Sequence, residues 1–329
     1  MRVLVVMALL LSSSFAGAQT PALPPPTDTV APAIAGVVAG GTPVKVIKSG
    51  FSGSEGPISL PDGSLIFTEQ PASRITRIDK DGNASTFLEN TNGSNSVVFD
   101  PRGRLISVQN NPGKTAVGVI YPKGSETILA SGYDGRPFVR PNDITGDTKG
   151  GVYFSDPGLF GPPPASVPGS TLPPLPRAVY YIPPGGTVVK AADGIGYPNG
   201  MQLAPDEKTL YVNDTFGEYL LAFDVQKDGT LANRRNFGKY TGSTTGPIGA
   251  TISGADGLLI DSQGRLYAAT AAGVEVFGAQ GAHLGTIPFS RQPQNLSFAG
   301  PGRKTLYVVG RGAVFAVQML SQGVPGRAK

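Results

Sequence analysis

The chain has 329 residues, no cysteine, one histidine and a formal net charge of +4. Without cysteine there is no disulfide scaffold, thiolate nucleophile, or cysteine-bound zinc or iron–sulfur centre. The basic residues are scattered, whereas nucleic acid or an anionic membrane needs a clustered basic face, so we expect neither as a partner.

The first residues resemble a secretory signal peptide. Arg2 is followed by a short apolar run and by the small residues Ala16-Gly17-Ala18. This pattern predicts a signal peptide over residues 1–18, cleaved after Ala18, and therefore a periplasmic or secreted protein. Residues 19–42 are rich in Pro, Gly and Ala and are expected to form a flexible leader.

From Val44 onward, one short sequence motif recurs six times. Each copy has a polar residue, a short apolar strand, a turn centred on Asp or Pro, and a second β-branched or aromatic strand. The six copies of the motif are 39 to 57 residues apart and begin at Glu55, Asn95, Asn142, Asn199, Asp256 and Asn295. A hairpin repeated at this period predicts an all-β, six-bladed β-propeller. We assign the propeller to residues 43–320 and a C-terminal tail to 321–329.

The third repeat predicts four strands and the sixth only three. In the third repeat the strands are expected over residues 143–146, 152–155, 178–182 and 187–191. In the sixth they are expected over residues 296–298, 305–309 and 314–318. The missing outer strand is assigned to Val44–Lys48, because pairing the two ends of the chain closes the ring and removes an open sheet edge.

All six polar residues stand where an innermost strand begins, so they are expected at one mouth of a central channel. The long Pro-rich connection over residues 158–177 hangs over the same mouth. It is either a preorganised lid, which its position favours, or a surface loop.

Oxygen ligands from several blades point to a hard cation. Glu55 and Asp256 supply carboxylates, and Asn142 and Asn199 supply amide oxygens, which together suit calcium. Magnesium, manganese and zinc are the alternatives. Asn95 and Asn295 are assigned to substrate binding, although an Asn that opens a strand also serves to cap a turn.

Other polar residues near the mouth are candidates of second rank. Arg140 is expected to bind a substrate oxygen, with a structural salt bridge as the alternative. Asp156 is also assigned to substrate binding, and Glu69 and Asp214 end equivalent strands. The one histidine, His283, is expected in the outer hairpin of the fifth blade, so a Ser-His-Asp triad has no base.

Several segments carry a family resemblance over Val44 to Gln318. They include SEGPISLPDG, RPNDITGD, YPNGMQLAPDEKTLYVND and GADGLLIDSQGRLY. These motifs resemble the gluconolactonase/regucalcin (senescence marker protein) family of six-bladed propellers, which is more distantly similar to diisopropylfluorophosphatase. The resemblance implies a central divalent ion held by Glu55, Asn199 and Asp256, with Asn142 binding either metal or substrate.

The chain departs from that family at two places near the mouth. It has Ser107–Asn111 where sugar lactonases carry an acidic-His segment, and Asn95-Ser96 where they usually show Asn-Gly. The sequence favours a monomeric, metal-dependent lactonase in which Asp256 activates water or attacks the ester directly. The alternatives are a phosphotriesterase-like hydrolase and a non-catalytic propeller that binds calcium or a small ligand.

Overall fold

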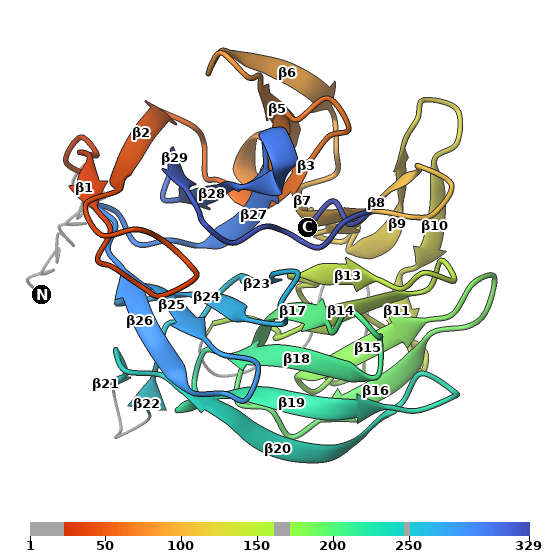
Figure 1. The fold of residues 1–329 in the computed structure, drawn as a ribbon. Helices are drawn as coiled ribbons and strands as arrows, with labels where there is room; N and C mark the ends of the chain where they lie inside the picture. Colours follow the sequence, from red (N-terminus) through yellow and green to blue (C-terminus); the bar gives the residue numbers. More distant parts are fainter. Residues whose placement is uncertain (1–22, 161–171, 247–250) are drawn as a thin grey trace, which may run out of the picture.

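Six antiparallel sheets surround a central axis in the structure, a computed structural model that describes residues 23–160, 172–246 and 251–329 (Figure 1). The sequence prediction of an all-β six-bladed propeller is confirmed. The predicted signal peptide and most of the predicted lid, residues 161–171, lie outside the described residues. No helix in the described part of the chain is long and apolar enough to cross a membrane.

Each blade is a sheet of consecutive strands, and the sixth also takes strands from the N-terminal segment. Blade 1 holds β3 (Glu55–Ser59), β4 (Leu65–Glu69), β5 (Arg74–Ile78) and β6 (Ala84–Glu89). Blade 2 holds β7 (Ser94–Phe99), β8 (Leu105–Gln109), β9 (Ala116–Tyr121) and β10 (Thr127–Ala130). Blade 3 holds β13 (Ile144–Gly146), β14 (Val152–Asp156), β15 (Ala178–Ile182) and β16 (Val189–Asp193). Blade 4 holds β17 (Pro198–Leu203), β18 (Thr209–Asp214), β19 (Tyr219–Val225) and β20 (Leu231–Lys239).

Blade 5 holds β23 (Leu258–Ile260), β24 (Leu266–Thr270), β25 (Gly273–Phe277) and β26 (His283–Ile287). Blade 6 holds β27 (Asn295–Ala299), β28 (Thr305–Gly310), β29 (Ala313–Gln318), β2 (Pro43–Ser49) and β1 (Thr29–Val30). Two small ribbons, β11 (Gly132–Tyr133) with β12 (Arg136–Pro137) and β21 (Thr244–Thr245) with β22 (Thr251–Ile252), lie outside the blades. In the described ranges the short helices are η1 (Gln70–Ala72) and η3 (Pro301–Arg303).

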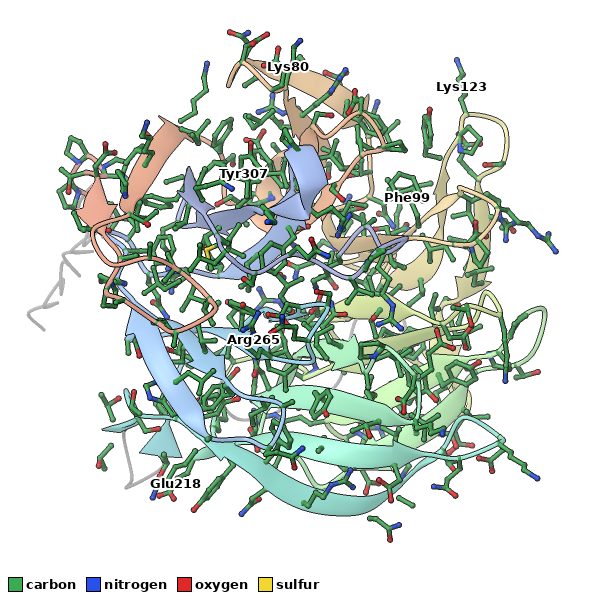
Figure 2. All side chains as sticks on the ribbon, in the orientation of Figure 1. Lys80, Phe99, Lys123, Glu218, Arg265 and Tyr307 are labelled. Atoms are coloured by element: carbon green, nitrogen blue, oxygen red, sulfur yellow. The ribbon has the colours of Figure 1, made fainter. Side chains whose placement is uncertain are left out.

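The hydrophobic core lies between neighbouring blades. Strands β14 and β15 are buried along their whole length, and β15 is an apolar run, because another sheet packs on each of their faces. Ile58 and Ile66 of blade 1, for example, pack in one cluster with Val97 and Leu105 of blade 2. Polar side chains such as Lys80 and Lys123 project from the outer edges (Figure 2). Packing between blades leaves the axis available for polar residues.

The N-terminal segment closes the ring. Strand β2 pairs antiparallel with β29, with Val44 opposite Val317, as the sequence predicted. The prediction of a flexible leader is wrong for residues 29–42, however. Strand β1 pairs with β2, and Ile34, Val37 and Val38 are buried against blades 5 and 6. These apolar side chains stabilise the segment by leaving water.

Residues 321–329, predicted as a tail, cross the end of the channel away from the mouth. Their hydrogen-bond partners include residues of five blades: Ser59, Asp143, Leu203, Ala204, Ser262, Ser297 and Arg303. Several of these partners stand at or just beyond the ends of innermost strands, and Figure 1 places the end of the chain near the axis. The segment therefore covers the channel on the side opposite Glu55 and Asp256.

Candidate functional site at the mouth of the channel

One cavity of about 700 Å³ lies at the mouth of the channel. Six of the eight residues singled out from the sequence line it: Glu55, Asn95, Arg140, Asn142, Asn199 and Asp256. They come from blades 1 to 5, and each stands at or just before the beginning of an innermost strand. The structure therefore brings together the four proposed cation ligands, Glu55, Asn142, Asn199 and Asp256.

Irregularities in strand register lie next to two of these residues, Glu55 and Asn199. The strand register shifts just after Glu55 in β3 and between Pro198 and Met201 in β17, and such bulges redirect a side chain. Close approach of the backbones requires the next residue to be glycine. A Cβ on Gly56 would lie 2.6 Å from Ser96 Cα, and one on Gly200 would lie 2.3 Å from Asp256 O.

Asn199 lines this cavity and has an unused acceptor. Its Nδ2 donates to Thr215 Oγ1 at 3.1 Å, and the Thr215 hydroxyl donates to the backbone oxygen of Ala255 at 2.6 Å. This arrangement fixes the orientation of the amide. Asn199 Oδ1 is buried and has no hydrogen-bond partner, which is costly unless another group binds it. Thr215 was not predicted from the sequence.

The two carboxyl groups repel each other in a site with little water. Burial raises the pKa of Glu55 to about 7, although a hydrogen bond from Asn295 acts in the opposite direction. Burial also raises the pKa of Asp256 well above its ordinary value, with Glu55 and Asp143 adding to the effect. Lys329 lowers the pKa of Glu55, and Arg311 and Arg140 lower that of Asp256, but burial outweighs them, so the two carboxyl groups still favour binding of a positive ion.

The donor set fits a hard divalent cation. Within the described ranges, no group of three or more His, Cys, Asp or Glu side chains is placed to hold a metal ion. A cation would therefore depend on the amide oxygens of Asn142 and Asn199, and on water, beside the two carboxylates. The free oxygen of Asn199 and the raised pKa values of both acids agree with such an ion.

Asn295 supports Glu55 and is not among the residues that line the cavity. Its Nδ2 donates to Glu55 Oε2 at 3.3 Å, and Gln294 Nε2 donates to Glu55 Oε1 at 2.9 Å. Gln294 also lines the cavity and was missed in the sequence, because it precedes the recurring polar position. Asn95 does line the cavity, and its Nδ2 donates to the backbone oxygen of Asn142 at 3.0 Å.

Asp156 does not line the cavity either. Its carboxylate accepts hydrogen bonds from the backbone N–H groups of Val139, Arg140 and Gly158. Because these backbone N–H groups lie in loops, no neighbouring strand accepts their hydrogen bonds, and the Asp156 carboxylate does so instead. Glu69 and Asp214, which end the equivalent strands, likewise accept from backbone N–H groups. Asp156 thus holds the loop that carries Arg140, and its contact with substrate stays a prediction.

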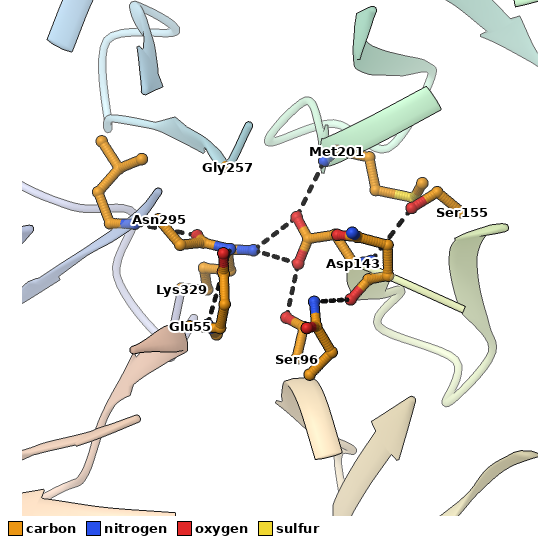
Figure 3. A network of polar contacts seen from close by, with 12 residues as sticks. Glu55, Ser96, Asp143, Ser155, Met201, Gly257, Asn295 and Lys329 are labelled. Atoms are coloured by element: carbon orange, nitrogen blue, oxygen red, sulfur yellow. Dashed lines mark hydrogen bonds and ion pairs between the residues drawn. The ribbon is translucent and has the colours of Figure 1, made fainter. Parts of the chain in front are cut away.

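A buried ion pair lies in the channel beyond the cavity (Figure 3). Lys329 Nζ is 2.7 and 2.8 Å from the two carboxylate oxygens of Asp143, and both side chains are almost fully buried. Asp143 also accepts from Ser96 Oγ at 2.6 Å and from Met201 N at 3.1 Å. Ser96, the departure from Asn-Gly in the second repeat, thus supplies a hydroxyl to Asp143. The pair connects the innermost strands of blades 2, 3 and 4.

Aromatic residues form one part of the rim. Phe160 and Tyr197 line the cavity, and both rings contact Phe216 at centroid distances of 5.0 Å. The Arg177 guanidinium lies 5.2 Å from the ring centroids of Tyr197 and Phe216. The described ends of the connection over residues 158–177 therefore contact the mouth. His283, as expected, lies on an outer strand of blade 5, away from this site.

Comparisons with known proteins agree with this architecture. Residues 53–311 match the family model described as the SMP-30/Gluconolactonase/LRE-like region. The chain is 28% identical over 291 residues to a gluconolactonase of Zymomonas mobilis, covering 81% of this chain and 78% of that protein. It is 25% identical over 277 residues to a pentonolactonase of Haloferax volcanii, covering 82% and 86%.

Solved structures give the same result. The structure of a gluconolactonase from Xanthomonas campestris superposes with a TM-score of 0.75 at 27% identity, covering 92% of this chain and 99% of that one. A calcium-binding protein, regucalcin, from Agrobacterium tumefaciens has a TM-score of 0.68 at 17% identity, over 86% and 97%. The second likeness concerns the fold alone. The match of the family model over most of the chain shows that this protein belongs to the SMP-30/gluconolactonase/LRE-like family.

Proposed function

We propose that this protein is a lactonase, a hydrolase that opens a cyclic ester. One observation carries the proposal: four residues at or just before the beginning of innermost strands of four blades line one cavity, namely Glu55, Asn142, Asn199 and Asp256. The relatives named gluconolactonase and pentonolactonase, which cover about four-fifths of the chain, support the same reaction class.

The proposed cofactor is one divalent cation, with calcium as the first choice because every candidate ligand is a hard oxygen. Glu55, Asn142, Asn199 and Asp256 would hold it, and Thr215, Gln294 and Asn295 would orient two of these ligands. When bound, such an ion supplies Lewis acidity, which polarises the ester carbonyl and stabilises negative charge on its oxygen.

Asp256 is the proposed general base. Its carboxylate takes a proton from water while the water oxygen adds to the carbonyl carbon. The bond between that carbon and the ring oxygen then breaks, and the departing alkoxide takes the proton back from Asp256. Arg140 and Asn95 line the same cavity and would orient the lactone. Direct attack by Asp256 on the ester is the rival mechanism.

We propose that the protein acts outside the cytoplasm. The signal peptide predicted over residues 1–18 would direct the enzyme to the periplasm or outside the cell. We propose that it acts there as a monomer on a small-molecule substrate.

A panel of lactones, assayed with and without a chelator, tests the proposal. We expect hydrolysis of at least one lactone, loss of activity with chelator and recovery with calcium. Glu55→Gln should reduce kcat/KM roughly a hundredfold or more, since even partners of metal ligands typically contribute ten- to a hundredfold. The matched control Glu89→Gln changes an exposed acid and should behave like the wild type.

Two results would contradict the proposal. Turnover of organophosphates but no lactone would favour a phosphotriesterase. Calcium binding without turnover of any ester would favour a non-catalytic propeller.

A further inference from the structure

The charges that line the cavity do not match a neutral substrate. Four charged side chains line it: the carboxylates of Glu55 and Asp256 and the guanidinium groups of Arg140 and Arg311. If the cation of the proposed function is bound, its two charges balance the two carboxylates. The two guanidinium groups then leave the cavity with a surplus positive charge. This step rests on the proposed function and deepens it.

Arg140 is placed by its backbone, and its side chain remains available. The backbone N–H donates to Asp156 Oδ1 at 2.9 Å, which fixes the residue at the mouth. The sequence left open a structural salt bridge for this arginine. Among the residues that the structure describes, its guanidinium makes no ion pair or hydrogen bond, and the side chain is half-buried at the cavity wall. Its planar fork of donors therefore faces a site where a ligand oxygen can bind.

Arg311 occupies a backbone position that disfavours arginine. It forms with Gly312 the two-residue turn between β28 and β29, and the φ angles are 51° and 73°. Turns with two positive φ angles are of type I′ and favour Asn-Gly. A long side chain in this conformation is strained, and strain of this kind concentrates at functional sites.

The turn that carries Arg311 is connected to the proposed cation ligand. The Arg311 backbone N–H donates to Gln294 Oε1 at 2.7 Å, while Gln294 Nε2 donates to Glu55. The Arg311 guanidinium donates to Gln292 Oε1 at 3.0 Å, another residue of the cavity wall. Arg311 is thus a positively charged side chain held next to the site by a turn that would be more stable with asparagine.

We infer that Arg140 and Arg311 bind a carboxylate, and that the substrate is a lactone carrying a carboxylate group in addition to its ester. Arg140 of blade 3 and Arg311 of blade 6 line the same cavity as the proposed cation ligands. A lactone whose carbonyl lies at the cation site therefore has both guanidinium groups on the wall around it. Guanidinium groups match carboxylate geometry and carry a permanent charge. A neutral polyhydroxylated lactone would need hydrogen-bonding groups but no surplus of positive charge.

The test compares two lactones that have the same five-membered ring and differ in one substituent. One is γ-valerolactone, and the other has a carboxylate in place of its methyl group, 5-oxotetrahydrofuran-2-carboxylate. We expect the wild type to have at least tenfold higher kcat/KM for the carboxylate lactone, with a preference that shrinks as salt is added. Arg311→Asn and Arg140→Gln should each lower the ratio of the two kcat/KM values at least tenfold.

The choice of asparagine separates recognition from folding. Arg311→Asn gives the turn the sequence Asn-Gly, so its melting temperature should equal or exceed that of the wild type. The matched control Arg102→Gln removes an exposed arginine outside the cavity and should leave the ratio unchanged.

The following results would overturn the inference. One is a wild-type kcat/KM for the carboxylate lactone that is about equal to, or lower than, the kcat/KM for γ-valerolactone. Another is a fall in kcat/KM that is equal for both lactones in the two variants. Ring opening of any lactone forms a carboxylate, and arginines that bind only this product group would affect both substrates equally. If no lactone is hydrolysed, the proposed function fails, and calorimetry with 2-hydroxyglutarate on calcium-loaded protein decides the inference. Binding that Arg311→Asn weakens at least tenfold would support it, and the absence of binding would overturn it.

Discussion

Replacing Lys329 with methionine should destabilise the whole propeller. Methionine is of similar length, so the packing of the side chain changes little, but the Asp143 carboxylate loses its counter-ion. Both side chains of the pair are at most 4% exposed, so water cannot replace the ammonium. Ser96 and Met201 would remain as hydrogen-bond donors to the carboxylate.

The magnitude follows from the cost of an uncompensated buried charge. Removing one partner of a buried ion pair typically costs about 3–5 kcal/mol. For a domain of this size, that loss corresponds to a fall in melting temperature of roughly 6–10 °C. Differential scanning calorimetry on the wild type and on Lys329→Met measures it directly. Lys123→Met, which changes an exposed lysine, is the control and should shift the melting temperature by less than about 1 °C.

A second substitution shows whether charge is the cause. Adding Asp143→Asn to Lys329→Met removes the unpaired carboxylate, so the double variant should recover most of the lost stability. If Lys329→Met melts within about 1 °C of the wild type, the segment over residues 321–329 does not fasten the blades. If the double variant is as unstable as the single one, loss of packing and not charge explains the effect.

Three further predictions concern the site. In cation-free protein, burial raises the pKa of Glu55 from 4.5 to about 7, so the folded state keeps a proton that the unfolded state releases. Glu55 should therefore lower stability by up to about 3 kcal/mol as pH rises from 4.5 to 7. In chemical denaturation Glu55→Gln should remove that contribution and leave the one from Asp256, whose pKa is also raised, whereas calcium should remove both. Thr215→Val frees the Asn199 amide to rotate and should weaken calcium binding about tenfold, measured by calorimetry; unchanged affinity would mean that Thr215 does not orient the ligand. Single-turnover hydrolysis in oxygen-18 water should leave Asp256 unlabelled if it is the base, whereas a labelled carboxylate would establish direct attack, and Asp256→Asn with more than a few per cent of the wild-type rate would exclude both roles.

The repeat and the apolar runs made the fold predictable. The strand Ala178–Ile182 has the predicted bounds, and the closing strand differs from its prediction by one residue at each end. Apolar runs of this length bury both faces between neighbouring blades, so few alternatives fit them. Five of the six residues that open the repeats line the cavity at the mouth, and Asn295 does not.

Apart from the pairing of the two ends of the chain, side-chain contacts between distant segments were not predictable. The partner of Lys329 lies 186 residues earlier in the chain, and no local pattern connects the two. Asp156 resembled a rim carboxylate, but the loop N–H groups that it satisfies become visible only when the loop is folded. The apolar residues of the N-terminal segment are interspersed with Ala, Gly and Pro, a composition that resembles a linker until a surface covers them.

The central claim is that one divalent cation binds where Glu55, Asn199 and Asp256 meet. Calorimetric titration of calcium into chelator-treated protein at pH 8 tests it most directly. We expect one ion per chain for the wild type and no measurable binding for Glu55→Gln or Asp256→Asn, with both variants folded. A wild type that binds no divalent cation, or variants that bind calcium as tightly as the wild type, would contradict the account.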